Sequence, residues 1–158
     1  MAIEVRSSSV GDTLAIAEAI GRRLPSGVLI LLVGELGAGK TVFAKGLGRG
    51  LGVVGEITSP SYNLMIRYKG RVEFDHWDLY RVSDIDDDME FLESVYNTES
   101  VKAVEWGDKL KEAPDVPTLK IEIELVEGET NQRVMRLNGT REIINTTVEP
   151  VLKEWMER

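Results

Sequence analysis

Apolar positions, in one unbroken run and in several alternating ones, predict the strands of this chain. Val28–Val33 is entirely apolar, as expected of a strand buried on both faces of a sheet. Leu119–Leu125 alternates apolar and charged residues, which predicts a half-buried strand. Alternation on either side of the Lys69-Gly70 turn predicts a β-hairpin that runs from Tyr62 to His76. Further strands are expected at Ile3–Arg6, Val101–Val104 and Arg133–Leu137.

Apolar residues spaced three and four apart predict helices between these strands. The first helix is Asp12–Leu24, with Asp12 as the expected N-cap. A second runs from about Lys40 to Leu51, and a third, acidic at its start, covers Ser83–Tyr96. A final amphipathic helix is expected to cover the core with Trp155.

The order of these elements predicts a single α/β domain over residues 1–158. Its sheet is expected to be mixed, with a parallel centre, antiparallel hairpins and helices on both faces. The chain has no cysteine, which excludes disulfides and thiolate metal sites and indicates a cytoplasmic location. No apolar run is long enough to cross a membrane, and the N-terminus lacks the pattern of a secretory signal.

The charge balance bears on possible partners. The formal net charge is −8, whereas a free-standing nucleic-acid binder usually carries a basic patch. The small basic cluster of Arg67, Lys69 and Arg71 is interpreted as an ordinary solvated hairpin tip. An acidic protein that binds an anionic ligand must therefore use local groups: backbone amides, one lysine and a metal ion.

The segment Gly34–Thr41 supplies such groups. Its sequence GELGAGKT fits G-x-x-x-x-G-K-[ST], with an apolar strand before it and a helical pattern after it. Glycines allow backbone N–H groups to point at phosphates, Lys40 reaches the β- and γ-phosphates, and the Thr41 hydroxyl ligates Mg²⁺. The sequence therefore predicts a site for a nucleoside triphosphate and magnesium. The residues expected around the phosphates are Glu35, Leu36, Gly37, Ala38, Gly39, Lys40, Thr41 and Val42.

Enzymes with this loop usually need an acid at the end of a neighbouring strand. Asp78 follows the second hairpin strand, and Glu105 follows the strand that ends at Val104. Spacing alone does not rank the two. Asp75 and Asp108 are interpreted as surface charges.

Histidine and the aromatic residues have less specific interpretations. His76 is the only histidine, and a lone histidine beside a tryptophan is more often packed and hydrogen-bonded than catalytic. Without cysteines or further histidines, a zinc site is not expected. Trp77, Tyr80 and Trp106 are interpreted as residues of the core or as packing against a base.

Taken together, the motifs resemble one family. They are GELGAGKT at 34–41, TSPSY at 58–62, HWDLYR at 76–81 and EW at 105–106. This set is similar to the bacterial TsaE (YjeE) family, the P-loop ATPase needed for threonylcarbamoyladenosine modification of tRNA. The similarity covers nearly the whole chain in order and spacing.

The resemblance implies roles for individual residues. Lys40 and Thr41 match the family's phosphate and magnesium residues, and Glu105 matches a glutamate that helps to hold the magnesium. Asp78 matches an important aspartate of Walker-B type, so the expected catalytic residues are Lys40, Asp78 and Glu105. Thr58 and Ser59 match a switch-like loop near the γ-phosphate, and Thr13 and Arg133 match residues near the nucleotide.

This sequence departs from the family pattern in small ways. Val42 replaces a second threonine after the loop, SPSY keeps a hydroxyl at Ser61, and Gly107 stands where proline usually follows the EW pair. None of these changes removes a group with an assigned chemical role.

The function implied by the resemblance is ATP binding and slow ATP hydrolysis, with Mg²⁺, in partnership with the TsaD and TsaB proteins. Little affinity for free tRNA is expected. A small-molecule kinase that uses the same loop is the main alternative, although no arginine-rich lid is evident. A GTP-driven switch lacks its N-K-x-D motif, and a non-catalytic binding module is the remaining alternative.

Overall fold

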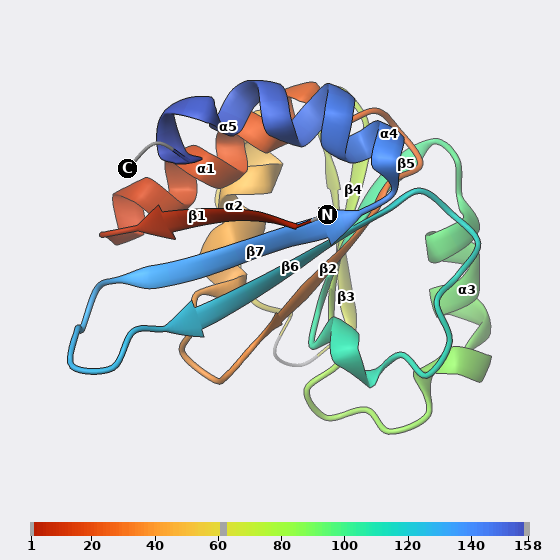
Figure 1. Ribbon diagram of the computed structural model, residues 1–158. Helices are drawn as coiled ribbons and strands as arrows, with labels where there is room; N and C mark the ends of the chain where they lie inside the picture. The colour runs from red at the N-terminus through yellow and green to blue at the C-terminus, as the bar shows by residue number, and fades with distance from the viewer. Residues whose placement is uncertain (1, 61–62, 157–158) are drawn as a thin grey trace.

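A mixed sheet forms the centre of the molecule (Figure 1). The computed structural model describes residues 2–60 and 63–156, and within these residues seven strands form one sheet. The strands are β1 (Ile3–Ser7), β2 (Leu29–Gly34), β3 (Met65–Lys69), β4 (Glu73–Asp78), β5 (Ser100–Glu105), β6 (Thr118–Leu125) and β7 (Arg133–Gly139). Their order across the sheet is β1-β7-β6-β2-β5-β4-β3.

The centre of the sheet is parallel and its margins are antiparallel, which confirms the predicted fold class. β2 runs parallel to β5 and β6, and β4 runs parallel to β5. β3 with β4, β6 with β7 and β1 with β7 are antiparallel pairs. The register pairs Glu105 with Leu32 on one side and with Asp78 on the other. The carboxyl ends of the three strands that precede the predicted site therefore meet at one edge.

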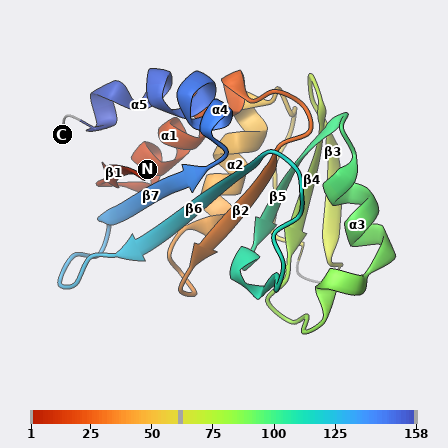
Figure 2. The same ribbon diagram turned by 45° about the vertical axis from the view of Figure 1, so that its right-hand side comes forward.

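Helices cover both faces of this sheet, as predicted. α1 (Val10–Arg23), α2 (Lys40–Gly50) and α5 (Glu149–Met156) lie on one face, and α3 (Met89–Tyr96) lies on the other (Figures 1 and 2). The larger apolar core fills the first interface and a smaller one lies under α3. None of the helices in the described part of the chain is long and apolar enough to cross a membrane.

Helices α1 and α2 pack backbone to backbone because glycines line their contact. A Cβ on Gly46 would lie 2.5 Å from the Ala17 Cβ, and one on Gly50 would lie 2.3 Å from the Glu18 carbonyl oxygen. Both distances are shorter than van der Waals contact allows, so larger side chains would push the helices apart.

Two helix starts differ from the prediction. The N-cap of α1 is Ser9, not Asp12: the Ser9 Oγ accepts a hydrogen bond from the Asp12 N–H at 3.0 Å. Asp12 reaches back to accept from the Ser8 N–H at 2.9 Å, so both residues satisfy free amides at the helix start. The predicted helix Ser83–Tyr96 is interrupted, because Asp88 caps α3 by accepting from the Phe91 N–H at 2.9 Å.

The C-terminal helix is not uniform. α4 (Arg141–Ile143) leads through a π-helical turn at 144–148 into α5. Pro150 has no N–H to pair with the Thr146 carbonyl, and the Arg23 guanidinium of α1 donates to that carbonyl at 3.2 Å instead. Trp155 is 8% exposed and joins the main core, as predicted.

Candidate functional site

The glycine-rich loop connects β2 to α2, as the sequence pattern predicts. Gly37 and Gly39 have φ values of 81° and 113°, in the left-handed region where side chains are strained. Residue Lys40 opens α2, so the positive end of that helix faces the loop. This arrangement is typical of a phosphate cradle.

The Lys40 side chain lies across the mouth of this loop. Its Nζ donates to the carbonyl oxygens of Gly34 at 2.6 Å and Glu35 at 2.8 Å, and it lies 4.1 Å from the centre of the Trp106 ring. Burial lowers the pKa of Lys40, while the charge of Glu105, first among several carboxylates, opposes that shift. A multiply charged anion would offer this ammonium stronger partners than two neutral carbonyls do.

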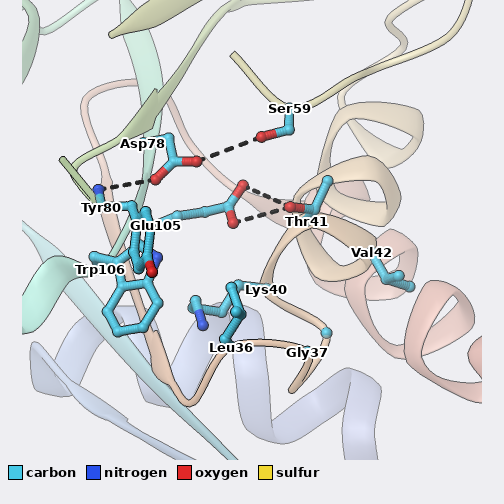
Figure 3. A pocket seen from close by; sticks show the side chains of 11 residues that line it. Leu36, Gly37, Lys40, Thr41, Val42, Ser59, Asp78, Tyr80, Glu105 and Trp106 are labelled. Carbon is cyan, nitrogen blue, oxygen red and sulfur yellow. Dashed lines mark hydrogen bonds between the residues drawn. The ribbon is translucent and has the colours of Figure 1, made fainter. Parts of the chain in front are cut away.

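The two candidate acids lie beside each other at the ends of β4 and β5. The Thr41 Oγ1 is 2.9 Å and 3.0 Å from the two carboxylate oxygens of Glu105 (Figure 3). Asp78 accepts from the Tyr80 N–H at 3.0 Å and lies 3.4 Å from the Ser59 Oγ. These groups and the loop line one hollow of about 330 Å³.

The hydroxyl and the carboxylate fit a magnesium ion chemically. Mg²⁺ prefers hard oxygen ligands and usually takes one or two from protein, completing its shell with water and phosphate oxygens. Thr41 and Glu105 offer that small set, and they already lie within hydrogen-bonding distance of each other. No cluster of three or more His, Cys, Asp or Glu side chains suited to a metal occurs among residues 2–60 and 63–156.

A second hollow of about 150 Å³ lies beside the loop. Its lining combines loop residues 37–39 with Thr13, Val42 and Arg133, all of which are expected to lie near the nucleotide. The Arg133 guanidinium donates to the carbonyl oxygens of Ala38 at 2.9 Å and Gly37 at 3.4 Å. Thr13 is buried, and its hydroxyl lies 2.7 Å from the Ser7 Oγ.

The segment 58–62 contributes through Ser59. Thr58 is exposed, and its N–H donates to the Tyr68 hydroxyl at 3.2 Å, whereas Ser59 lines the larger hollow. Ser61, which keeps the hydroxyl of the family motif, and Tyr62, the expected start of the hairpin, lie outside the described residues.

The three aromatic residues separate into two environments. Trp77 is buried under α3, and its Nε1 donates to the Ser94 Oγ at 2.9 Å. Tyr80 and Trp106 instead line the larger hollow, with ring centres 5.1 Å apart. Tyr80 is 48% exposed and is therefore not a core residue, while packing against a base, the other predicted role, stays a prediction. Trp106 has a φ of 62°, a strained backbone that functional sites often retain.

His76 is packed and hydrogen-bonded, as the sequence analysis favoured, but its partner had not been predicted. The ring is buried, and Nε2 lies 2.6 Å from Oε2 of Glu105. Because His76 and Glu105 sit on neighbouring strands, only the register of β4 against β5 reveals the contact.

The interpretation of Asp75 as a surface charge is wrong, whereas Asp108 is exposed as expected. Asp75 is fully buried and accepts from the Arg67 Nε at 2.8 Å and the Ser94 Oγ at 2.6 Å. The hydrogen bond to Asp75 raises the pKa of Arg67, so this arginine is not simply solvated. Lys102, beside Asp75 in the sheet, is also buried, and burial lowers its pKa to about 8.

The parallel strands, the glycine loop at their carboxyl ends and the helix that follows define a protein of the P-loop NTPase-like fold. Comparison with known proteins adds the family. The family model for "Threonylcarbamoyl adenosine biosynthesis protein TsaE" matches residues 7–135. The chain therefore belongs to the TsaE family, whose members act in threonylcarbamoyladenosine biosynthesis.

Individual relatives agree with this assignment. The TsaE protein of Treponema pallidum (strain Nichols) is 40% identical over 139 residues, covering 87% of this chain and 95% of that protein. The TsaE protein of Bacillus subtilis (strain 168) is 30% identical over 137 residues, covering 86% of each. A crystal structure of YdiB from the same genus and species superposes with a TM-score of 0.76 and 26% identity, covering 98% of this chain and 96% of that one.

Proposed function

We propose that this protein binds ATP with Mg²⁺ and hydrolyses it slowly, and that it acts on a TsaB–TsaD complex in threonylcarbamoyladenosine modification of tRNA. The observation that carries the proposal is the contact of Thr41 with Glu105 beside the Lys40 loop. A phosphate cradle, a hydroxyl and a carboxylate within one hollow are the groups that phosphoryl transfer to water requires. Membership of the family supplies the tRNA-modification context.

Binding of the triphosphate would use the loop amides and Lys40. The ammonium would exchange the Gly34 and Glu35 carbonyls for the β- and γ-phosphates, where its charge is better compensated. Bound Mg²⁺, held by Thr41 and Glu105, supplies neutralisation of phosphate charge. The nucleoside would lie in the second hollow, against Thr13, Val42 and the stem of Arg133.

Asp78 is proposed to orient the attacking water. Both Glu105 oxygens already contact Thr41, and one of them also contacts His76. Asp78 accepts from the Tyr80 N–H through Oδ1, whereas its Oδ2 contacts only Ser59, at 3.4 Å, so Oδ2 is the oxygen available to a water molecule. Through its contact with this same carboxylate, Ser59 would couple the presence of the γ-phosphate to residues 58–60.

Coupling to a partner requires that the ATP and ADP forms bind it differently, because otherwise hydrolysis would change nothing.

The test uses the purified protein with a TsaB–TsaD complex, ATP and substrate tRNA, and measures phosphate release and modified nucleoside. We expect the complex to stimulate hydrolysis and Lys40→Ala to abolish both signals. Full modification with Lys40→Ala would refute the proposal, and transfer of phosphate to a metabolite rather than to water would favour a kinase.

A further inference from the structure

His76 lies directly behind the proposed magnesium residues. It is two residues before Asp78 on β4, so both side chains leave the same face of the sheet. The ring is 0% exposed, and its Nε2 is 2.6 Å from Glu105 Oε2. Resting on the function proposed above, we propose that His76 is a positioning residue that fixes the orientation of the Glu105 carboxylate for magnesium.

The hydrogen-bond pattern assigns the ring hydrogen. A carboxylate only accepts hydrogen bonds, so the Nε2 of His76 must donate. The other nitrogen, Nδ1, is buried and meets no hydrogen-bonding partner among the described residues. A hydrogen on Nδ1 would be a buried donor without an acceptor, which is unfavourable. The ring therefore presents Nε2–H to Glu105 as a fixed donor.

Glu105 needs such a donor because its carboxylate is otherwise free to rotate. The terminal torsion of a glutamate is broad and has no sharp minimum. Thr41 does not choose an orientation, since its hydroxyl lies at nearly equal distances from both oxygens, 2.9 and 3.0 Å. His76 contacts Oε2 alone and so selects one orientation.

The surroundings of His76 keep its ring in place. Phe74, on the same face of β4, stacks against it with ring centres 6.4 Å apart and planes inclined by 12°. Groups that orient a metal ligand from behind typically change metal affinity by about 10- to 100-fold when they are removed. We therefore expect His76 to act on the magnesium dependence of nucleotide binding rather than on nucleotide binding itself.

The test compares two substitutions at this position. His76→Gln keeps an amide nitrogen about where Nε2 lies, whereas His76→Leu removes the donor and leaves an apolar side chain. Calorimetry gives the Kd for ATP with Mg²⁺ and with EDTA, and the ratio of the two values is the magnesium gain. We expect His76→Leu to lower the gain about tenfold or more, His76→Gln to retain most of it, and all three proteins to bind ATP equally in EDTA.

Three results would overturn the inference: an unchanged magnesium gain in His76→Leu, a loss in His76→Gln as large as in His76→Leu, or an equal loss of affinity with and without Mg²⁺. The last would mean that His76 supports nucleotide binding as a whole and not its magnesium dependence. A wild-type protein that binds no ATP would overturn the proposed function as well, so the two failures are distinguishable in the wild-type titration.

A second measurement needs no variant at position 76. The chain has a single histidine, so the imidazole ¹⁵N signals of the wild-type protein belong to His76 without further assignment. We expect the hydrogen on Nε2, and we expect Glu105→Gln to shift the Nε2 signal. A hydrogen on Nδ1, or signals indifferent to Glu105→Gln, would overturn the inference even if His76→Leu failed to fold.

Discussion

At the scale of single residues, the site consists of two acids with different neighbours. Glu105 is 3% exposed and contacts Thr41 and His76, whereas Asp78 lies at the strand end with Ser59 and the Tyr80 amide. A buried carboxylate held by a hydroxyl and an imidazole suits a metal ligand. A carboxylate at the rim of the hollow suits the orientation of an attacking water molecule.

These neighbours predict separable effects of removing each charge. Glu105→Gln should weaken ATP binding about tenfold or more in Mg²⁺ and leave it unchanged in EDTA. Asp78→Asn should leave MgATP binding nearly intact and lower the hydrolysis rate about 100-fold or more. Titration of both variants, with single-turnover phosphate release, checks the division. If Asp78→Asn weakened MgATP binding and Glu105→Gln lowered only the hydrolysis rate, Asp78 would be the metal ligand and Glu105 the residue that orients water.

Lys102 predicts a pH dependence of stability. Its pKa is about 8 in the folded protein, lowered by burial, against an ordinary value of 10.5. Below pH 8, Lys102 is protonated in both the folded and the unfolded protein, so the full cost of burying its charge opposes folding. As pH rises from 8 to 10.5, the unfolded state binds more protons than the folded one, so this penalty is relieved.

Wild type should therefore gain stability relative to Lys102→Met on going from pH 7.5 to pH 10. The gain in the free energy of unfolding should be about 2 kcal/mol, since one pKa unit corresponds to about 1.4 kcal/mol. Urea unfolding of both proteins at both pH values measures it. The Lys102→Met protein serves as the control, because every other titrating group is common to both. A constant difference between the two would contradict the assigned shift.

At the scale of elements, the β6–β7 hairpin supports the glycine loop through Arg133. This guanidinium donates to Gly37 and Ala38 of the loop and to Thr130 and Gln132 of its own hairpin. All four acceptors are carbonyls. Arg133 thus restrains the loop from the side opposite to its phosphate-facing amides.

Removal of this restraint should weaken phosphate binding as such. We expect Arg133→Ala to lower the affinity for inorganic tripolyphosphate about tenfold, and that for ATP by at least this factor, because the Arg133 stem is also proposed to contact the nucleoside. Arg136→Ala is the matched control, since that residue leaves the opposite face of β7 and pairs with Glu4 and Glu124. A loss confined to ATP would mean that Arg133 acts only through the nucleoside and does not restrain the loop.

Two helical glycines, one inside the contact of α1 with α2 and one outside it, should respond in opposite ways to substitution by alanine. A Cβ on Gly46 would lie 2.5 Å from Ala17, so Gly46→Ala should destabilise the protein by about 1–3 kcal/mol. Gly11, also helical, would place its Cβ at an ordinary 3.6 Å from the Ser9 Oγ. Gly11→Ala should be stabilising by up to about 1 kcal/mol. Thermal unfolding distinguishes the pair, and equal effects would contradict the packing argument.

Local patterns were enough to predict the elements but not all of their ends. The apolar run of β2, the alternation of β6 and the motif between β2 and α2 each depend on neighbours in sequence. The helix starts were harder, because Ser9 and Asp12 are both good caps and satisfy each other's amides. Asp88 likewise favours a cap over a helix interior, which divides the segment 83–96.

The missed features of the site depend on contacts between elements. Asp75 looked like a surface charge, yet its partners come from β3 and α3. The contact of His76 with Glu105 needs the register of β4 against β5. No periodicity along one strand carries this information, so these contacts could not be predicted from the sequence alone.

At the scale of the whole molecule, charge predicts weak contact with RNA. The net charge is −8, and two arginines of the basic hairpin cluster are engaged within the protein. Arg67 pairs with Asp75, and Arg71 donates to the carbonyls of Gly21 and Leu24. Phosphate neutralisation, the main source of non-specific affinity, is therefore poorly supplied.

We expect no binding of free tRNA tighter than about 1 µM at physiological salt. Fluorescence anisotropy with labelled tRNA measures it, and the TsaB–TsaD complex, assayed alone and together with this protein, is the comparison. A submicromolar Kd for the isolated protein would contradict the expectation.

The position of β1 has a consequence for synthesis on the ribosome. β1 is made before β7, yet in the sheet it lies at the edge and pairs with β7, from which every other strand of the sheet separates it in the sequence. Ile3 pairs with Leu137, so β1 cannot pair until β7 has been made. Until then β1 exposes both its backbone edges and its apolar side chains. β1 is thus made before most of the sheet but is among the last strands to pair, and nascent chains arrested before β7 should remain sensitive to protease within β1.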